Sequence, residues 1–410
     1  MMNVQQIKSD FPIFKKHPDL TYLDSAGTSL KPQVVIDKLV EYYSQYSANI
    51  KRGIYKLSEK ATEEFEKTRE VVANFIGARK KEVIFTHSTT ESLNLVAYSL
   101  GRKIIEKNDE IVVSIMEHHS NFVPWQVLAG EVGANFKVIG VEDNGYLLGL
   151  DNVEEIITKR TKILALTYVS NVLGTINPLK KIIQAAKKIN PKLIVVIDAA
   201  QAAPHMKIDV KDLDCDFLAF SSHKMLGPTG VGVLWGKEHL LNEMFPFQYG
   251  GEMIAEVRID KTIFAQPPEK FEAGTPAIAE VIAFKEAIKY LQKIGLENIR
   301  KHEKELMDYA LHSLTNTFGK KIKIYGPPGI ENRGGVIAFS LSGTHPHDLA
   351  TILDENDICV RAGHHCAMPL HTRLDIPAST RASLYLYNDK GDIDKLVKVL
   401  KESLAILSKS

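Results

Sequence analysis

A lysine that directly follows a short apolar run marks the segment best suited to chemistry. Residues 217–220 are hydrophobic, and Ser221, Ser222, His223 and Lys224 come next, ahead of a turn rich in glycine and proline. An unperturbed lysine has a pKa of about 10.4, so its amine stays protonated at neutral pH unless burial disfavours the charged form. A desolvated lysine at the end of a buried strand is therefore suited to act as an amine in Schiff-base chemistry.

Polar residues also follow three other apolar runs. They are His118, Asn171 and Asp198, with Gln201 just beyond the aspartate. Open α/β sheets bind ligands outside the carboxyl ends of their strands, so we expect these side chains to meet Lys224 in one cleft. An aspartate that can hold a pyridinium proton and a histidine that can stack on a ring are, with the lysine, the supports that pyridoxal phosphate needs as an electron sink. These residues therefore predict a pyridoxal-phosphate enzyme.

The segment after residues 83–85 has the pattern of an anion site. Ser88 and Glu91 fit a capping box that opens a helix, and Thr89 and Thr90 place two hydroxyls in its first turn. Free N–H groups and the dipole at a helix N-terminus favour a phosphate. A capped helix without a ligand remains the alternative for this segment taken alone. No Walker lysine or GxGxxG motif follows, so a nucleotide site is not predicted.

Three cysteines, Cys215, Cys359 and Cys366, are too few for a disulfide framework and show no CxxC spacing. Any cysteine function therefore rests on a single thiol. Cys366 lies in residues 363–380, a stretch without clear periodicity that is typical of a functional loop. The two histidines directly before it give poor tetrahedral spacing, so we predict no metal site.

The composition excludes several functional classes. The 410 residues carry 51 Lys and Arg against 50 Asp and Glu, a net charge of +1, which argues against a nucleic-acid binder. The longest apolar run, residues 193–197, stops at Asp198 and is far too short to cross a bilayer. Residues 1–14 lack the hydrophobic region of a signal peptide, so we expect a cytoplasmic protein without membrane contact.

The apolar pattern predicts the elements that must position these residues. Five short runs alternate with helical patterns, as a parallel sheet covered on both faces requires; they are residues 83–85, 111–115, 163–166, 193–197 and 217–220. After residue 271 the pattern changes to long helices and then to strands, including 335–340 and the alternating stretch 382–387. We expect an arm at 1–20 packed on the small domain, a large domain at 21–275, and a small α+β domain at 276–410 that carries the Cys366 loop.

With these residues in place, the chain resembles the class V, fold-type I pyridoxal-phosphate enzymes, and among them the SUF-type cysteine desulfurases and the related selenocysteine lyases. The resemblance covers nearly the whole chain, in order and spacing. Its motifs lie at residues 22–28, 52–53, 89–91, 117–121, 170–174, 198–201, 215–232, 271–276, 361–367 and 381–383. It implies a large domain with a mainly parallel sheet of the seven-stranded type and a smaller α+β C-terminal domain.

The resemblance also implies a role for each matching residue. Lys224 resembles the lysine that binds the cofactor, Asp198 the partner of the pyridine nitrogen, Gln201 the neighbour of the ring hydroxyl, and His118 the catalytic residue that stacks on the ring. Residues that resemble the phosphate site are Thr89, Thr90, Ser221 and His223, with Thr275 reaching the phosphate of the other subunit of a homodimer. Residues that resemble the clamp for the substrate carboxylate are Asn171, Arg361 and Arg381.

Cys366 carries the functional distinction within this resemblance. The implied reaction converts L-cysteine to L-alanine and leaves the sulfur as a persulfide on Cys366, which a small acceptor protein then takes for iron–sulfur cluster assembly. L-selenocysteine as the substrate is one alternative. A class V aminotransferase or carbon–sulfur lyase is another, and it would share Lys224, Asp198 and Arg381 without depending on Cys366.

Overall fold

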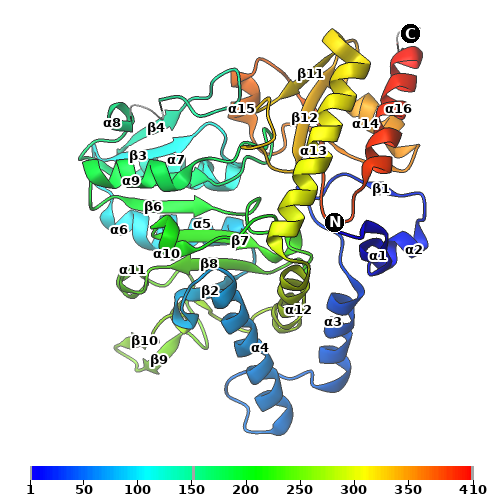
Figure 1. The fold of residues 1–410 in the computed structure, drawn as a ribbon. Coiled ribbons are helices and arrows are strands. Elements are labelled where there is room, and N and C mark those ends of the chain that lie inside the picture. Colours follow the sequence, from blue (N-terminus) through cyan, green and yellow to red (C-terminus); the bar gives the residue numbers. More distant parts are fainter. Residues whose placement is uncertain (1, 150–152, 408–410) are drawn as a thin grey trace.

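The computed structural model describes residues 2–149 and 153–407, and its centre is a seven-stranded sheet (Figure 1). One strand, β8, runs antiparallel to both of its neighbours, and the other six run in the same direction. In spatial order the strands are β2 (Val83–Thr86), β8 (Gly232–Gly236), β7 (Phe217–Ser221), β6 (Ile194–Asp198), β5 (Thr161–Thr167), β3 (Glu110–Ser114) and β4 (Asn135–Ile139). The predicted α/β class and mainly parallel sheet are confirmed, and the five predicted runs are β2, β3, β5, β6 and β7.

Helices cover both faces of this sheet, so its strands are buried on both sides. Successive residues of β5 point to opposite faces: Ile163 belongs to one hydrophobic cluster and Leu164 to another. The first cluster includes residues of α5 (Thr89–Val96) and α7 (Val123–Val132). Helices that contribute to the second cluster are α3 (Gln33–Gln45), α4 (Lys56–Phe75), α9 (Leu179–Ile189) and α12 (Ile278–Ile294). Burial on both faces explains why the strands read as unbroken apolar runs.

A second, antiparallel sheet of four strands lies beside the first. Its order is β11 (Ile322–Tyr325), β12 (Val336–Leu341), β15 (Ser379–Ser383) and β14 (Arg361–Gly363). It shares a third hydrophobic cluster with α13 (Leu296–Phe318), α14 (Pro346–Asp354) and α16 (Lys390–Leu407). The strand expected at 335–340 is therefore present as β12.

The strand expected at 382–387 is a correction, because β15 ends at Ser383 and a turn follows. Residues 384–387 are all buried, so the alternating pattern of their residue types does not mark a strand with one buried and one solvent-exposed face. Tyr385 donates its hydroxyl to the Pro204 carbonyl at 3.1 Å, and the hydroxyls of Tyr387 and Ser25 lie 2.7 Å apart. These tyrosines pack in the hydrophobic cluster of the large sheet and bond loops there, instead of extending β15.

Shorter elements complete the chain. Two strand pairs lie outside the main sheets: β1 (Thr21–Tyr22) with β13 (Ile358–Cys359), and β9 (Ile254–Val257) with β10 (Thr262–Phe264). The short helices are α1 (Val4–Ser9), α2 (Pro12–Lys16), α6 (Arg102–Ile104), α8 (Val153–Ile156), α10 (Val210–Leu213), α11 (Glu238–Glu243) and α15 (Met368–Arg373). Among the described residues, no helix combines the length and apolar character that a membrane span needs.

The N-terminal arm contacts both parts of the molecule. The ring of Phe11 meets Tyr290 of α12 and Tyr387 edge to face, with centroids 6.1 and 5.1 Å apart, and Lys8 forms an ion pair with Asp389 at 3.1 Å. Helix α12 itself belongs to the hydrophobic cluster of the large sheet. The division at residues 275/276 therefore stays a prediction, and this packing favours a boundary after α12.

We predict that Phe11→Ala destabilises the whole protein, because the ring is fully buried between the arm, α12 and the small domain. Truncating a buried phenylalanine typically costs about 3–5 kcal/mol. Thermal unfolding should show a lower midpoint than the wild type. Ile13→Ala on the same arm is the control, since Ile13 is 36% exposed. Equal midpoints for Phe11→Ala and wild type would contradict this role of the arm.

Candidate functional site

The carboxyl ends of β3, β5, β6 and β7 meet in a cavity of about 160 Å³ that residues of the small domain close. All but one of the predicted site residues line it: Thr89, Thr90, His118, Asn171, Asp198, Gln201, Ser221, His223, Lys224, Arg361, Cys366 and Arg381. The exception, Thr275, is exposed and lies outside this cavity. The expected convergence of strand-end residues on one cleft is thus observed.

Lys224 closes the short helix Ser222–Lys224 directly after β7, and it lines the same cavity as Asp198, the last residue of the neighbouring strand β6. Burial lowers the pKa of the Lys224 amine to about 8, and the Asp198 carboxylate opposes that shift. Burial also raises the pKa of Asp198. The charge of Lys224 and a 2.9 Å hydrogen bond from the Ala200 N–H act in the opposite direction and lower it. An amine whose pKa lies near neutrality can lose its proton and react as a nucleophile.

Two buried polar atoms of the cavity residues, one on Gln201 and one on Arg381, have no hydrogen-bond partner. Within the described part of the chain, Gln201 Oε1 accepts no hydrogen bond and Arg381 Nε donates none, although both side chains are buried. The amide of Gln201 is held by its Nε2, which donates to the Ala26 carbonyl at 2.7 Å. Native proteins rarely leave buried polar atoms unpaired, so this acceptor and this donor are available to bound ligand groups.

Hydroxyl and N–H groups gather at the opposite end of the cavity, where α5 begins. Ser88 caps this helix by accepting the Glu91 N–H at 3.2 Å, whereas the Glu91 carboxylate bonds the His87 N–H instead of that of Ser88. The hydroxyls of Thr89 and Ser221 lie 2.6 Å apart, and Thr89 N–H donates to Ser221 at 2.8 Å. The predicted helix start is confirmed, and its donors suit an anion.

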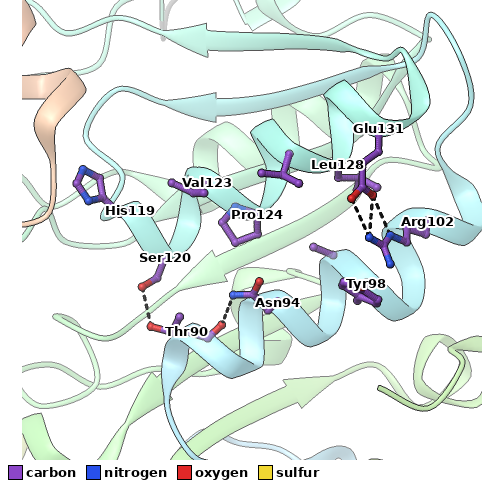
Figure 2. Close-up of a pocket in the computed structure, with 12 residues that line it drawn as sticks. Thr90, Asn94, Tyr98, Arg102, His119, Ser120, Val123, Pro124, Leu128 and Glu131 are labelled. Atoms are coloured by element: carbon purple, nitrogen blue, oxygen red, sulfur yellow. Dashed lines mark hydrogen bonds and ion pairs between the residues drawn. The ribbon is translucent and has the colours of Figure 1, made fainter. Parts of the chain in front are cut away.

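His118 lies between this anion end and Lys224. Its Nδ1 accepts the Ser120 N–H at 3.1 Å, and Ser120 and Thr90 share a bond of 2.7 Å between their hydroxyls (Figure 2). Burial, followed by the charge of Lys224, lowers the pKa of His118 to about 3. The imidazole is therefore neutral at physiological pH, which suits it to stack on a protonated pyridine ring without charge repulsion.

The small domain contributes Arg381 from β15 and Arg361 from β14. Arg381 is fully buried and donates to the Asp24 carboxylate at 2.7 Å and to the Asn171 carbonyl at 3.2 Å. Burial lowers the pKa of Arg381, and Asp24 opposes that shift. Its Nε has no hydrogen-bond partner and the residue lines the cavity, so the side chain can donate to a carboxylate ligand.

Cys366 stands at the mouth of the cavity in a turn of the small domain. His365 and Cys366 both have positive φ angles, 51° and 58°. Asn171 Nδ2 donates to the His365 carbonyl at 2.7 Å, and the His119 N–H donates to the Cys366 carbonyl at 2.7 Å. The stretch 363–380 is thus less irregular than expected, because it contains helix α15.

Comparison with known proteins places this geometry in a family. The profile described as Aminotransferase class-V matches residues 21–396. The chain belongs to the class-V aminotransferase family. A class-V relative named probable cysteine desulfurase, from Halalkalibacterium halodurans, is 48% identical over 406 residues, 98% of each chain.

Two solved structures are similar to this one along nearly the whole chain. The apo cysteine desulfurase of Thermococcus onnurineus NA1 is 39% identical, with a TM-score of 0.94 and 99% of both chains covered. The cysteine desulfurase CsdA of Escherichia coli, determined in an S-sulfonic acid form, is 36% identical, with a TM-score of 0.91 and 99% of both chains covered. The fold is therefore fold-type I, as expected.

The cofactor of this class-V protein is pyridoxal phosphate, and the cavity fits it. The unpaired Gln201 Oε1 can accept from a ring hydroxyl, buried Asp198 can hold a pyridinium proton, and Lys224 supplies the amine. The donors at the start of α5 provide for the phosphate. These groups occupy one continuous cavity, so a single molecule can satisfy all of them.

The sequence did not predict the buried residues that support the cavity without lining it. Buried Glu117 accepts bonds from the Ser114 hydroxyl at 2.5 Å, the Thr167 N–H at 3.0 Å and Asn121 Nδ2 at 2.6 Å. It thereby ties β3 and β5 to the loop that carries His118. Burial raises its pKa to about 8. The polar run after β3 was the available signal, although nothing in it distinguishes a buried carboxylate from an exposed one.

We predict that Lys224 in the cofactor-free protein reacts with acetic anhydride with a midpoint near pH 8, because burial lowers its pKa. Asp198→Asn removes a negative charge that favours the protonated amine, so the midpoint should move to lower pH. Peptide mass spectrometry across a pH series would follow Lys224 alone. A midpoint above pH 10, or an upward shift in Asp198→Asn, would contradict the electrostatic arrangement.

Proposed function

We propose that this protein is a cysteine desulfurase that converts L-cysteine to L-alanine and collects the sulfur as a persulfide on Cys366. The observation that carries the proposal is the shared cavity of Lys224, Arg381 and Cys366. An amine with a pKa near neutrality, a guanidinium with a free N–H and a thiol are the groups that binding an amino acid and removing its sulfur require. The names of the class-V relatives support the same reaction.

We assign the cofactor contacts as follows. Lys224 binds the aldehyde carbon, Asp198 the pyridine nitrogen and Gln201 the ring hydroxyl, while His118 lies against the ring. The phosphate is held by Thr89, Thr90, Ser221 and His223. When bound, pyridoxal phosphate supplies an electron sink for the bonds at the α-carbon of the substrate. Lys224, once free, is placed to carry the proton of that carbon.

We assign the substrate carboxylate to Arg381, Asn171 and Arg361. The backbone and side chain of Asn171 already bond Arg381 and the Cys366 turn, so this residue couples the clamp to the nucleophile. A carboxylate that pairs with Arg381 directs the substrate side chain toward the cavity mouth, where Cys366 stands. Charge-assisted bonds of this kind fix orientation as well as affinity.

The sulfur step balances without an added oxidant. The Cys366 thiolate forms a bond to the substrate sulfur while the substrate Cβ–S bond breaks. The electron pair of that bond remains with carbon, which takes up a proton and becomes the methyl group of alanine. Cys366 is left as a persulfide, and a second thiol can remove its outer sulfur as sulfide or transfer it onward.

We further propose a small sulfur-acceptor protein as the partner, with iron–sulfur cluster assembly as the use of the sulfur, in the cytoplasm. The half-buried Cys366 lies near the surface, beside exposed His364 and Met368, so its outer sulfur can reach another protein. All three cysteines are free thiols, which is the state that a reducing compartment maintains.

We also propose that the protein is a homodimer. A second cavity, of about 420 Å³, lies between α5 and α7 and shares Thr90 and Ser120 with the catalytic cavity (Figure 2). Beside it Tyr98 and Val127 are each 52% exposed, which is unusual for apolar side chains at a cavity. Thr275 is exposed and does not line the cavity of its own chain. This position is compatible with the predicted contact between Thr275 and the phosphate bound by the other subunit.

We predict that purified, cofactor-loaded protein forms alanine from L-cysteine, and that a thiol reductant stimulates this by regenerating Cys366. In Cys366→Ala the alanine should fall to background while the cofactor absorbance persists. Alanine that persists in the variant would overturn Cys366 as the sulfur acceptor, and pyruvate in place of alanine would favour a carbon–sulfur lyase. Activity on L-selenocysteine alone would favour a selenocysteine lyase.

We predict that Val127→Lys converts a dimer into a monomer, because it places a charge in the exposed apolar surface around the second cavity. Light scattering after gel filtration measures the mass. Val138→Lys is the matched control, since Val138 is 41% exposed on the edge strand β4. An unchanged mass in Val127→Lys would place any interface elsewhere.

A further inference from the structure

The turn that carries Cys366 has a backbone that must be held from outside. Two consecutive non-glycine residues, His365 and Cys366, have positive φ angles of 51° and 58°. Such angles crowd Cβ against the backbone and persist only where surrounding contacts fix them. The contacts that fix this turn therefore decide where the Cys366 thiol points.

His119 contacts this turn at the nucleophile and again two residues after it. Its backbone N–H donates to the Cys366 carbonyl at 2.7 Å, and its Nε2 accepts the Met368 N–H at 3.0 Å. Met368 is the first residue of α15, so the imidazole ties the start of that helix to the large domain. Figure 2 shows His119 apart from the other labelled residues, toward the ribbon at the edge of the view.

His119 lines the second cavity and not the catalytic one, so its contact with the site runs through the Cys366 turn and through its neighbour His118. The Nε2 bond requires a neutral imidazole, because a protonated ring has no acceptor. His119 faces two other imidazoles, those of His118 and His364. Burial, followed by the charge of His364, lowers the pKa of His119, which keeps Nε2 an acceptor at neutral pH.

We propose that His119 is a positioning residue for Cys366: it bonds Cys366 and Met368 and holds the thiol over the cavity. The inference rests on the proposed desulfurase reaction and deepens it. Asn171 holds the same turn from the preceding residue, through the His365 carbonyl, yet it also bonds the substrate clamp. The His119 ring is therefore the side chain through which the position of the nucleophile can be changed separately.

The test compares four variants of the cofactor-loaded full chain. His119→Leu fills the space without an acceptor, His119→Gln can place an amide oxygen near the position of Nε2, and His119→Asn is too short to do so. Thr372→Ala is the control, because Thr372 bonds the Met368 carbonyl within α15 and does not touch His119. Two readouts are used: kcat and KM for alanine formation, and the rate at which iodoacetamide alkylates Cys366 in the absence of cysteine.

We expect kcat to fall about tenfold in His119→Leu and His119→Asn, with KM within about twofold of wild type, because cysteine still binds while the thiol is displaced. His119→Gln should recover most of kcat, and Thr372→Ala should match wild type. Alkylation of Cys366 should change by several-fold in the Leu and Asn variants and not in the Gln variant or the control.

Unchanged kcat and alkylation in both the Leu and Asn variants would overturn the proposal. So would a Gln variant as impaired as Asn, since it would show that the ring is needed for packing and not as an acceptor. Should His119→Leu fail to fold, the Gln and Asn pair decides. Alkylation requires no turnover, so it tests the positioning even if wild type forms no alanine, a result that would overturn the desulfurase proposal alone.

Discussion

Hydrogen bonds between the Cys366 turn and the edge of the large sheet are the contacts on which the whole site depends. The sheet supplies Lys224 and Asp198, whereas the thiol and both arginines belong to the small domain. Neither part contains the full set of groups. Because the turn has an unfavourable backbone conformation, its position over the cavity is fixed by bonds from the large domain, through Asn171 and His119.

Burial gives the polar groups of the cavity their chemistry. Removing Lys224 from water disfavours its charged form, and the nearby Asp198 limits that effect, so the amine titrates near neutrality. The same environment keeps His118 neutral. Arg381 keeps its place beside a carboxylate, Asp24, that compensates part of its charge. Among the residues that line this cavity, Gln201, Arg381 and His365 each have a buried polar atom without a hydrogen-bond partner in the described structure.

The fold and the convergence of most candidate residues on one cavity could be predicted from the sequence, because their signals are local. Strands buried on both faces read as apolar runs, and the residue after each run must lie at one edge of the sheet. What could not be predicted depends on contacts between distant segments. The end of β15 at Ser383 follows from tyrosines that pack in the hydrophobic cluster of the large sheet, and the roles of Glu117 and His119 follow from bonds to other elements.

The central claim is that the small domain delivers one thiol, Cys366, to a substrate held between the cofactor site of the large domain and the arginines of the small domain. The most direct measurement is a single turnover of the cofactor-loaded protein with sulfur-labelled L-cysteine, followed by peptide mass spectrometry without reductant. We expect one labelled sulfur on the peptide of Cys366 and none on those of Cys215 or Cys359. Label recovered only as free sulfide, or attached to Cys359, would contradict the account.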